Sequence, residues 1–198
     1  MRSALLLMVA AVLIWSGIAP KDRFTWFLEV VPVLIGLPIA LIVERRHGLT
    51  MILFALMCFH AIILCVGGKY TYAEVPAGFF FQGLFHTARN HYDRLGHLAQ
   101  GFVPAILFRE WLLRKGALAK KTFLPVLVIS MCLAFSAFYE LIEWFTAEVK
   151  GEAAEAFLGT QGDPWDTQWD MFMALVGSCL SLLCLTKIHD RQIASLKK

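Results

Sequence analysis

One stretch of the sequence decides both the fold class and the position of a candidate site: RNHYDRLGHLAQG, residues 89–101. Its ionisable and amide side chains lead directly into an apolar segment, residues 102–113. At the helical spacing i, i+3, i+4 and i+7, one face of a helix would carry Asn90, Asp93, Arg94 and His97. A polar stripe that continues into a hydrocarbon-bound helix costs free energy, so this stripe indicates polar partners or a function.

The composition identifies an integral membrane protein. Of the 198 residues, 59% are hydrophobic and 17% are charged, and the mean hydropathy is +0.66. Soluble domains carry about 45–50% apolar and about 25% charged residues. The net charge of +3 is small, and the basic residues stand in short clusters between apolar runs, which indicates membrane orientation and argues against nucleic-acid binding. The five cysteines lie within apolar runs without a CxxC pair, so we expect small buried residues and no disulfide framework.

The apolar segments predict a six-helix transmembrane bundle of the all-α class, formed by a single transmembrane domain of residues 1–198. A helix that crosses the hydrocarbon core needs about 20 mostly apolar residues. The predicted helices cover about residues 4–19, 26–43, 49–66, 95–113, 123–145 and 169–186. We interpret the first as a retained helix, because signal-peptide cleavage after Ala19 would leave Pro20 at the new N-terminus.

The distribution of Lys and Arg predicts the orientation. With the N-terminus inside, the inner connections and the tail hold most of these residues: Arg2, Arg45, Arg46, Arg114, Lys115, Lys120, Lys121, Lys187, Arg191, Lys197 and Lys198. We therefore expect both termini in the cytoplasm and the connections of residues 67–94 and 146–168 outside. Three predicted helices then bring polar residues to the same depth, and we predict a polar cluster near the outer face.

The predicted helix of residues 123–145 carries two carboxylates near its outer end, Glu140 and Glu143. At i and i+3 they face roughly the same way, so they could share a metal ion or divide into an acid and a base. The alternative is that they pair with Arg89 or Arg94 and hold helices together. Glu140 lies one turn deeper and is costlier to leave unpaired, which favours a function there.

The last predicted helix is preceded by the run GDPWDTQWD, residues 162–170. Asp163 followed by Pro164 is typical of an N-cap and the first helical residue, and the helix dipole favours Asp166 in the first turn. Capping does not account for Asp170, which lies a turn further into an apolar helix. Asp170 therefore indicates a function, whereas Asp166 fits either interpretation.

Three histidines lie near these carboxylates on the predicted outer side: His86, His91 and His97. Imidazole together with carboxylate suits Zn, Mn or Fe, although the spacing matches no strong metal-binding motif such as HExxH. His97 as a general base, or as a hydrogen-bond donor to a phosphate, accounts for the same residues. We expect His47 and His189 in solvated connections, and His60 in an interhelical hydrogen bond.

An aromatic run in the outer connection indicates contact with the membrane interface: Tyr70, Tyr72, Phe79, Phe80, Phe81 and Phe85. We expect these side chains to anchor the connection at the level of the lipid headgroups. Beside Arg89 and Arg94, the same aromatic side chains would suit a lipid headgroup with its phosphate.

Four stretches, taken in order, resemble the YjdF family of bacterial inner-membrane proteins: GKYTY at 68–72, RNHYDRLGH at 89–97, FYELIEW at 138–144 and GDPWDTQWD at 162–170. The resemblance covers about residues 50 to 185. It implies a multi-pass protein of the bacterial inner membrane and no particular activity.

The chain also resembles, more loosely, VanZ-like membrane proteins, which are associated with glycopeptide-antibiotic resistance. The likeness rests on three pairs of polar residues: Asp93 with His97, Glu140 with Glu143, and Asp166 with Asp170. The sequence departs from that group by carrying Glu143 where an amide is usual and Asp170 where Asn is usual. The additional negative charge favours a cation in this chain.

The leading functional hypothesis is a small membrane enzyme or binding protein that acts on a lipid or lipid-linked envelope substrate at the outer leaflet. His97 and Glu140 would perform acid–base work. A divalent metal ion would be held by Asp93, Glu143, Asp166 and Asp170. A phosphate of the substrate would be bound by Arg89, Arg94 and His91.

Two alternative functions remain. A transporter coupled to cations or protons predicts ionisable residues at several depths, whereas the sequence gathers them on one side, apart from Arg109. A structural membrane protein would use the same residues as an interhelical salt-bridge network. The sequence contains no nucleotide-binding loop and no GxSxG motif, which argues against a nucleotide-driven machine.

Overall fold

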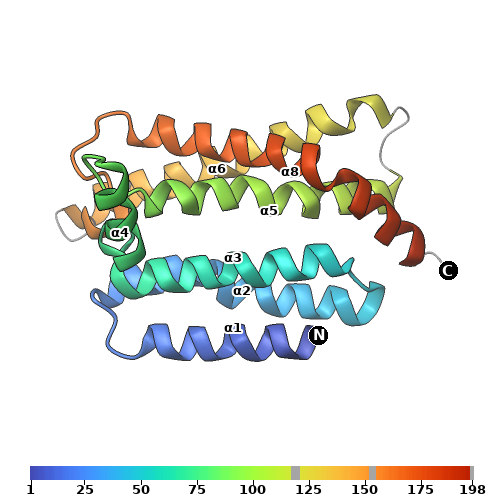
Figure 1. Ribbon diagram of the computed structural model, residues 1–198, viewed down its shortest axis with the longest axis horizontal. Helices are drawn as coiled ribbons and strands as arrows, with labels where there is room; N and C mark the ends of the chain where they lie inside the picture. The colour runs from blue at the N-terminus through green and yellow to red at the C-terminus, as the bar shows by residue number, and fades with distance from the viewer. Residues whose placement is uncertain (117–120, 152–154, 197–198) are drawn as a thin grey trace.

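The computed structural model describes residues 1–116, 121–151 and 155–196, and this part of the chain contains helices and no strands (Figure 1). The expected all-α class is therefore confirmed. In chain order the elements are α1 (Arg2–Gly17), α2 (Arg23–His47), α3 (Met51–Tyr70), η1 (Tyr72–Glu74), α4 (Pro76–Phe85), α5 (Tyr92–Lys115), η2 (Lys121–Phe123), α6 (Leu124–Lys150), α7 (Glu155–Leu158) and α8 (Asp166–Leu196).

Among the described residues, four helices are long and apolar enough to cross a membrane: α2, α3, α6 and α8. The helix α1 is apolar but shorter, with 16 residues. The helix α5 is long enough, with 24 residues, but its charged side chains make it less apolar. The chain is thus confirmed as an all-helical membrane protein, whereas the expectation that six helices cross the membrane stays a prediction.

Most of the helices extend beyond the predicted apolar spans at one or both ends, because backbone hydrogen bonding continues where hydropathy falls. The helix α2 begins after Asp22, whose side chain accepts the Thr25 N–H at 2.6 Å. The largest difference is α8, which continues to Leu196 instead of ending near residue 186. Its last turns bury His189 and Ile193, so one face of the helix keeps packing after the apolar run has ended.

The long helices form two groups that lie side by side (Figure 1). The first group contains α1, α2 and α3, with Val30 and Leu53 fully buried in its core. The second contains α5, α6 and α8, with Ala105 and Val128 fully buried, and α3 packs on α5 between the groups. Both termini lie at one end of the bundle and α4 lies at the other (Figure 1).

Two glycines allow α5 and α8 to approach closely. A Cβ atom at Gly101 would overlap the carbonyl of Ala174, and one at Gly177 would overlap the carbonyl oxygen of Leu98. Small residues of this kind let helix backbones meet in membranes, where packing drives association. The close contact holds the buried face of α8 against α5.

Replacing Gly101 by Ala is expected to lower the free energy of unfolding by about 1–3 kcal/mol, because the added methyl group has no room beside the Ala174 carbonyl. Gly36→Ala is the matched control, since an added Cβ there meets nothing within 4 Å. Thermal unfolding in detergent, followed by circular dichroism, compares the two variants. Equal melting temperatures would contradict the close packing of α5 on α8.

The connection between α3 and α5 contains the short helix α4. Its phenylalanines are exposed: Phe79, Phe80, Phe81 and Phe85. Interfacial anchoring needs such exposure, and anchoring stays a prediction. The prediction is wrong for Tyr72, which is buried and packs edge-on against Tyr92 with ring centroids 5.6 Å apart.

The cysteines are free thiols. Cys58, Cys65 and Cys132 are buried, as predicted for small apolar side chains. The prediction is wrong for Cys184, which is exposed on the outer surface of α8. An apolar run predicts a helix but not which of its side chains face a neighbouring helix, so the sequence pattern alone did not separate the two cases.

Candidate functional site

The candidate site is centred on His97, which is buried in the second turn of α5. Asp93 lies one turn earlier on the same helix face, with its Oδ1 atom 3.6 Å from His97 Nε2. On the other side of the ring, Nδ1 lies 3.0 Å from Oε1 of Gln100 and 3.6 Å from Oε1 of Glu140 on α6. Both ring nitrogens therefore face polar atoms, and two different helices supply them.

Four carboxylate side chains from α5, α6 and α8 gather around this imidazole. Their possible ligand atoms form two groups, and within each group all atoms lie within 4.8 Å of one another. The first group is Asp93, His97 and Asp170; the second is His97, Glu140 and Glu143. All five residues are buried, and His97 belongs to both groups. Residues more than seventy positions apart in the sequence, such as Asp93 and Asp170, thus lie next to each other. The sequence predicted polar residues of three helices at one depth, and these residues come from three helices.

Two oxygen atoms in this cluster have no hydrogen-bond partner among the described residues. They are Oε1 of Glu140 and Oδ1 of Asp170, both shielded from solvent. Buried polar atoms in folded proteins almost always have a partner, which can be protein, water or an ion. These two oxygens are therefore free to bind a ligand held between α6 and α8.

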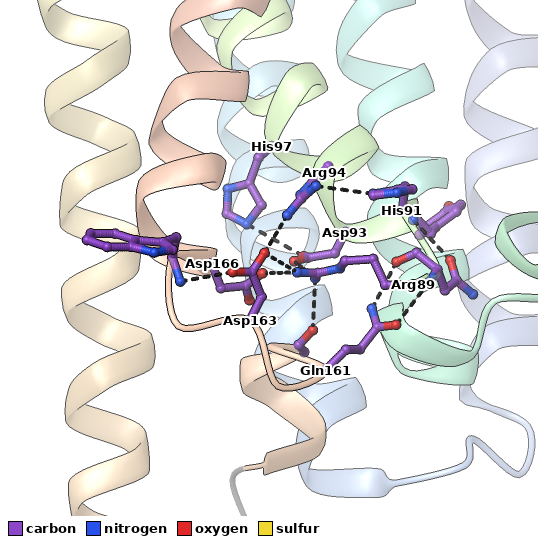
Figure 2. Close-up of polar contacts among 12 residues, drawn as sticks. Arg89, His91, Asp93, Arg94, His97, Gln161, Asp163 and Asp166 are labelled. Atoms are coloured by element: carbon purple, nitrogen blue, oxygen red, sulfur yellow. Dashed lines mark hydrogen bonds and ion pairs between the residues drawn. The ribbon is translucent and has the colours of Figure 1, made fainter. Parts of the chain in front are cut away.

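Arginines close the end of the bundle over the cluster (Figure 2). The guanidinium of Arg89 lies 2.5 Å from Asp166 and 3.4 Å from Asp163, and it donates to the carbonyl of Gly159 at 3.2 Å. The same guanidinium is 3.9 Å from Asp93, which connects this polar cap to the cluster. Asp166 is thereby engaged with an arginine and does not belong to either group of ligand atoms.

Arg94 reinforces the cap. Its Nη2 atom donates to Asp163 at 2.7 Å, and its guanidinium lies 5.0 Å from the ring centroid of Trp169. His91 contacts Arg94 at 3.4 Å (Figure 2). The three residues predicted to bind a phosphate are thus engaged within the protein, and substrate binding by them stays a prediction that requires some of these contacts to open.

The electrostatics of the cap shift two pKa values. The pKa of Asp163 is lowered, first by the hydrogen bond from the Trp165 N–H and then by Arg94 and Arg89. Burial lowers the pKa of His91, and the same two arginines lower it further. At neutral pH the cap therefore contains an ionised Asp163 opposite two guanidinium groups, which favours the closed arrangement.

Two expected helix positions differ in the structure. Asp163 does not cap α8, which begins at Asp166; its side chain instead accepts the Trp165 N–H at 3.0 Å in the preceding turn. Asn90 lies before α5 rather than on its polar face. There its side chain accepts the Tyr92 N–H and donates to the Val75 carbonyl, both at 3.0 Å, because an amide can serve the ends of two helices at once.

A cavity of about 410 Å³ opens beside the cluster, lined by α2, α3, α5 and α6. Its polar lining includes Glu29 and Tyr139 in addition to His97. Its apolar walls include Ile35 and Phe138, whose side chains are 58% and 61% exposed, so the cavity reaches the surface that faces lipid. A polar interior with an apolar, laterally open wall suits an amphiphilic ligand.

His60 also lines this cavity, and its expected interhelical hydrogen bond is wrong. Its Nε2 atom is shielded from solvent and has no hydrogen-bond partner among the described residues. Glu29, buried on α2, was not identified as a site residue either, although a carboxylate in an apolar helix is a signal for one. Both residues face the cluster from the first group of helices.

A second buried polar network lies at the opposite end of the bundle and was not expected. Glu110 on α5 accepts hydrogen bonds from Thr50, from Arg114 and from Nε2 of His189 at 3.0 Å. The prediction of a solvated His189 is wrong, because this residue is fully buried and also contacts Arg109 at 2.9 Å. Ionisable residues therefore occur at two depths, and the sequence signal was the pair at i and i+4, Glu110 and Arg114.

Comparisons with known proteins identify the family. Residues 1–191 match a family model described as "Predicted membrane protein (DUF2238)". The chain is 48% identical over 187 residues to "Inner membrane protein YjdF" of Escherichia coli (strain K12), covering 94% of this chain and 90% of that protein. No solved structure matches. The resemblance to the YjdF family is confirmed, whereas the looser likeness to VanZ-like proteins stays a prediction. From the family match and the long apolar helices, the chain is a multi-pass membrane protein that belongs to the DUF2238 family.

Proposed function

We propose that this protein binds a divalent cation between α5, α6 and α8 and acts with it on the headgroup of a lipid or lipid-linked envelope substrate. One observation carries the proposal: two groups of possible ligand residues share His97, and each group contains an oxygen with no hydrogen-bond partner among the described residues. Imidazole with several carboxylates is a ligand set that suits Zn, Mn or Fe.

The charge of the cluster supports a cation. Four carboxylates surround His97, and a fifth, Glu29, faces the same cavity. The nearest guanidinium, that of Arg89, is 3.9 Å from Asp93 but is already paired with Asp166. Buried carboxylates without matching positive charge are costly in a membrane, so bound protons or a bound cation must offset them.

The geometry favours a change in the roles expected for two residues. Asp93, His97 and Asp170 are the first ligand set, so His97 serves better as a ligand than as a free general base. Glu140 and Glu143 lie on the Nδ1 side of the ring, where together with His97 they form an alternative ligand set or accept a proton. A divalent cation would polarise a phosphoryl or carbonyl oxygen of the headgroup. Gln100 orients the imidazole through its bond to Nδ1.

The cavity supports a lipid-like substrate. Its wall of apolar side chains reaches the lipid-facing surface at Ile35 and Phe138, while its inner end contains His97 and Glu143. A hydrocarbon chain would lie against the wall with its headgroup toward the cluster. In this proposal six helices cross the inner membrane, both termini are cytoplasmic, and the cluster faces the outer leaflet, in keeping with the distribution of Lys and Arg.

A structural role is the second candidate, and one observation favours it. Arg89 and Arg94 already pair with Asp163 and Asp166, as an interhelical salt-bridge network would require. Transport has less support, because α5 and α8 pack backbone to backbone at Gly101, between the two polar networks. The experiment below separates the metal site from the structural network.

Elemental analysis of the purified protein in detergent tests the proposal after loading with Zn²⁺ or Mn²⁺ and removal of free metal. We expect about one bound divalent ion per chain in the wild type, lost in His97→Ala and in Asp170→Asn, because both remove a ligand. Asp190→Asn is the matched control, since Asp190 is an acid on α8 that pairs with Arg109 at the other end of the bundle.

Circular dichroism and gel filtration establish that each variant is folded before its metal content is compared. Absence of bound metal from the loaded wild type would refute the proposed site, and so would full retention of metal in both site variants. Either result would leave the structural network as the better account of the cluster.

A further inference from the structure

A second cavity, of about 450 Å³, lies at the end of the bundle that carries the termini. It is formed by the last turns of α2, the first turns of α3 and the last turns of α5. Its walls are apolar and include Val43, Leu53 and Leu107. Trp111, which is 51% exposed, stands at its margin. The cavity is thus separate from the cluster around His97 and opens toward the membrane-facing surface.

The rim of this cavity is basic. His47 and Lys115 are exposed, and their side chains have no recorded hydrogen bond or ion pair in the part of the chain that the structure describes. Arg114 donates to the His47 carbonyl at 3.1 Å and to Glu110 at 2.6 Å, while its Nε atom is buried without a partner among the described residues. The side chains of His47 and Lys115 therefore remain available to an anion, next to the guanidinium of Arg114.

The acid among the described lining residues, Glu110, is held by its own partners. Both oxygens of Glu110 are engaged: Oε1 with the Thr50 N–H at 3.2 Å and with Arg114, and Oε2 with the Thr50 hydroxyl at 2.6 Å and with His189. The carboxylate is fully saturated and points toward the α3 terminus and α8. Because Glu110 and Arg114 offset each other's charge, the net positive charge of the rim comes from Lys115, and His47 adds ring nitrogens that can bond to an anion.

A basic rim above apolar walls selects an amphiphile over a soluble anion. The same end of the bundle carries further basic residues, among them Arg45, Arg46, Lys187 and Arg191. Basic residues next to the membrane surface attract anionic lipids, and basic pockets between transmembrane helices bind the headgroups of such lipids. The exposed indole of Trp111 is typical of the boundary between headgroups and hydrocarbon.

We propose that this cavity binds an anionic phospholipid. The phosphate lies at Lys115 and His47, beside the guanidinium of Arg114, and one acyl chain lies against Val43 and Leu107. Such a lipid joins the last turn of α2 to the last turn of α5, and it therefore ties together the two groups of helices at the end away from His97. This site does not depend on the proposed metal function.

The test measures lipid binding by native mass spectrometry and the melting temperature in detergent, with added phosphatidylglycerol or phosphatidylethanolamine. We expect phosphatidylglycerol to bind and to raise the melting temperature, and phosphatidylethanolamine to do so much less. Lys115→Ala is expected to weaken phosphatidylglycerol binding about fivefold, and the double variant His47→Ala/Lys115→Ala to weaken it further. The control is Arg45→Ala/Lys187→Ala, which removes two exposed basic residues outside the cavity.

Three results would overturn the proposal. The first is an equal response to both lipids, which would mean a general effect of added lipid. The second is equal loss of binding in the control variant, which would mean that only the overall charge of this end matters. The third is an equally large stabilisation by inorganic phosphate, which would mean a phosphate site without a lipid chain.

Discussion

Replacing Glu143 by Gln is expected to raise the melting temperature of the protein in a chelator and to remove most of its response to added divalent cation. Without a cation, Glu143 adds a fourth buried carboxylate around His97, and neutralising it relieves repulsion. With a cation, wild type gains RT ln(1 + [L]/Kd), which is about 2.7 kcal/mol at a hundredfold excess over Kd. Melting temperatures in EDTA and in Zn²⁺ or Mn²⁺ measure both effects.

The control for this prediction is Glu148→Gln. Glu148 is an exposed acid on the same helix, and its loss should change neither the stability in EDTA nor the gain from metal. If Glu143→Gln is instead less stable than wild type in EDTA, Glu143 acts as a partner in a structural network. If the variant keeps the full gain from metal, the cation does not bind at Glu143.

Replacing Arg89 by Met is expected to lower the free energy of unfolding by about 3–5 kcal/mol, the range for breaking a buried ion pair by removing one partner. The change leaves Asp166 and the Gly159 carbonyl without their hydrogen-bond donor, and it removes the positive charge next to Asp93. Thermal or denaturant unfolding in detergent measures the loss.

Lys21→Met provides the comparison for Arg89. Lys21 pairs with Glu74, and the two side chains are 50% and 46% exposed, so its loss should cost about 0–1 kcal/mol. The double variant Arg89→Met/Asp166→Asn should recover part of the stability, because the unpaired carboxylate is gone. No recovery would mean that Arg89 stabilises the cap through Gly159 and through packing, and not through its charge.

The positions of the helices followed from the apolar runs, because the cost of burying polar groups in hydrocarbon restricts where a spanning helix can lie. The common depth of Asp93, Glu140 and Asp170 followed from helix direction and spacing alone. The sequence could not identify the partners of each acid. Asp166 is 77 positions from Arg89, and only the packing of α8 on α5 brings the two together.

The two misjudged histidines share one property: their surroundings depend on the packing of other helices. His189 follows the last apolar run of α8, and its burial depends on Glu110 and Arg109 from another helix. His60 stands on an apolar helix and faces a cavity, so no described side chain lies where its expected hydrogen-bond partner would be. Such features are set by the space between helices, which hydropathy does not report.

The N-terminal end of α1 and the C-terminal end of α8 lie at the end of the bundle opposite α4 (Figure 1). A fluorescent protein or an affinity tag fused to either end would therefore stand clear of the cluster and of the exposed phenylalanines of α4. When the molecule is tethered to a sensor surface through such a tag, in a nanodisc or a supported bilayer, the end of the bundle that carries α4 would face the flowing solution. Metal and lipid titrations could then be recorded without removing the tag.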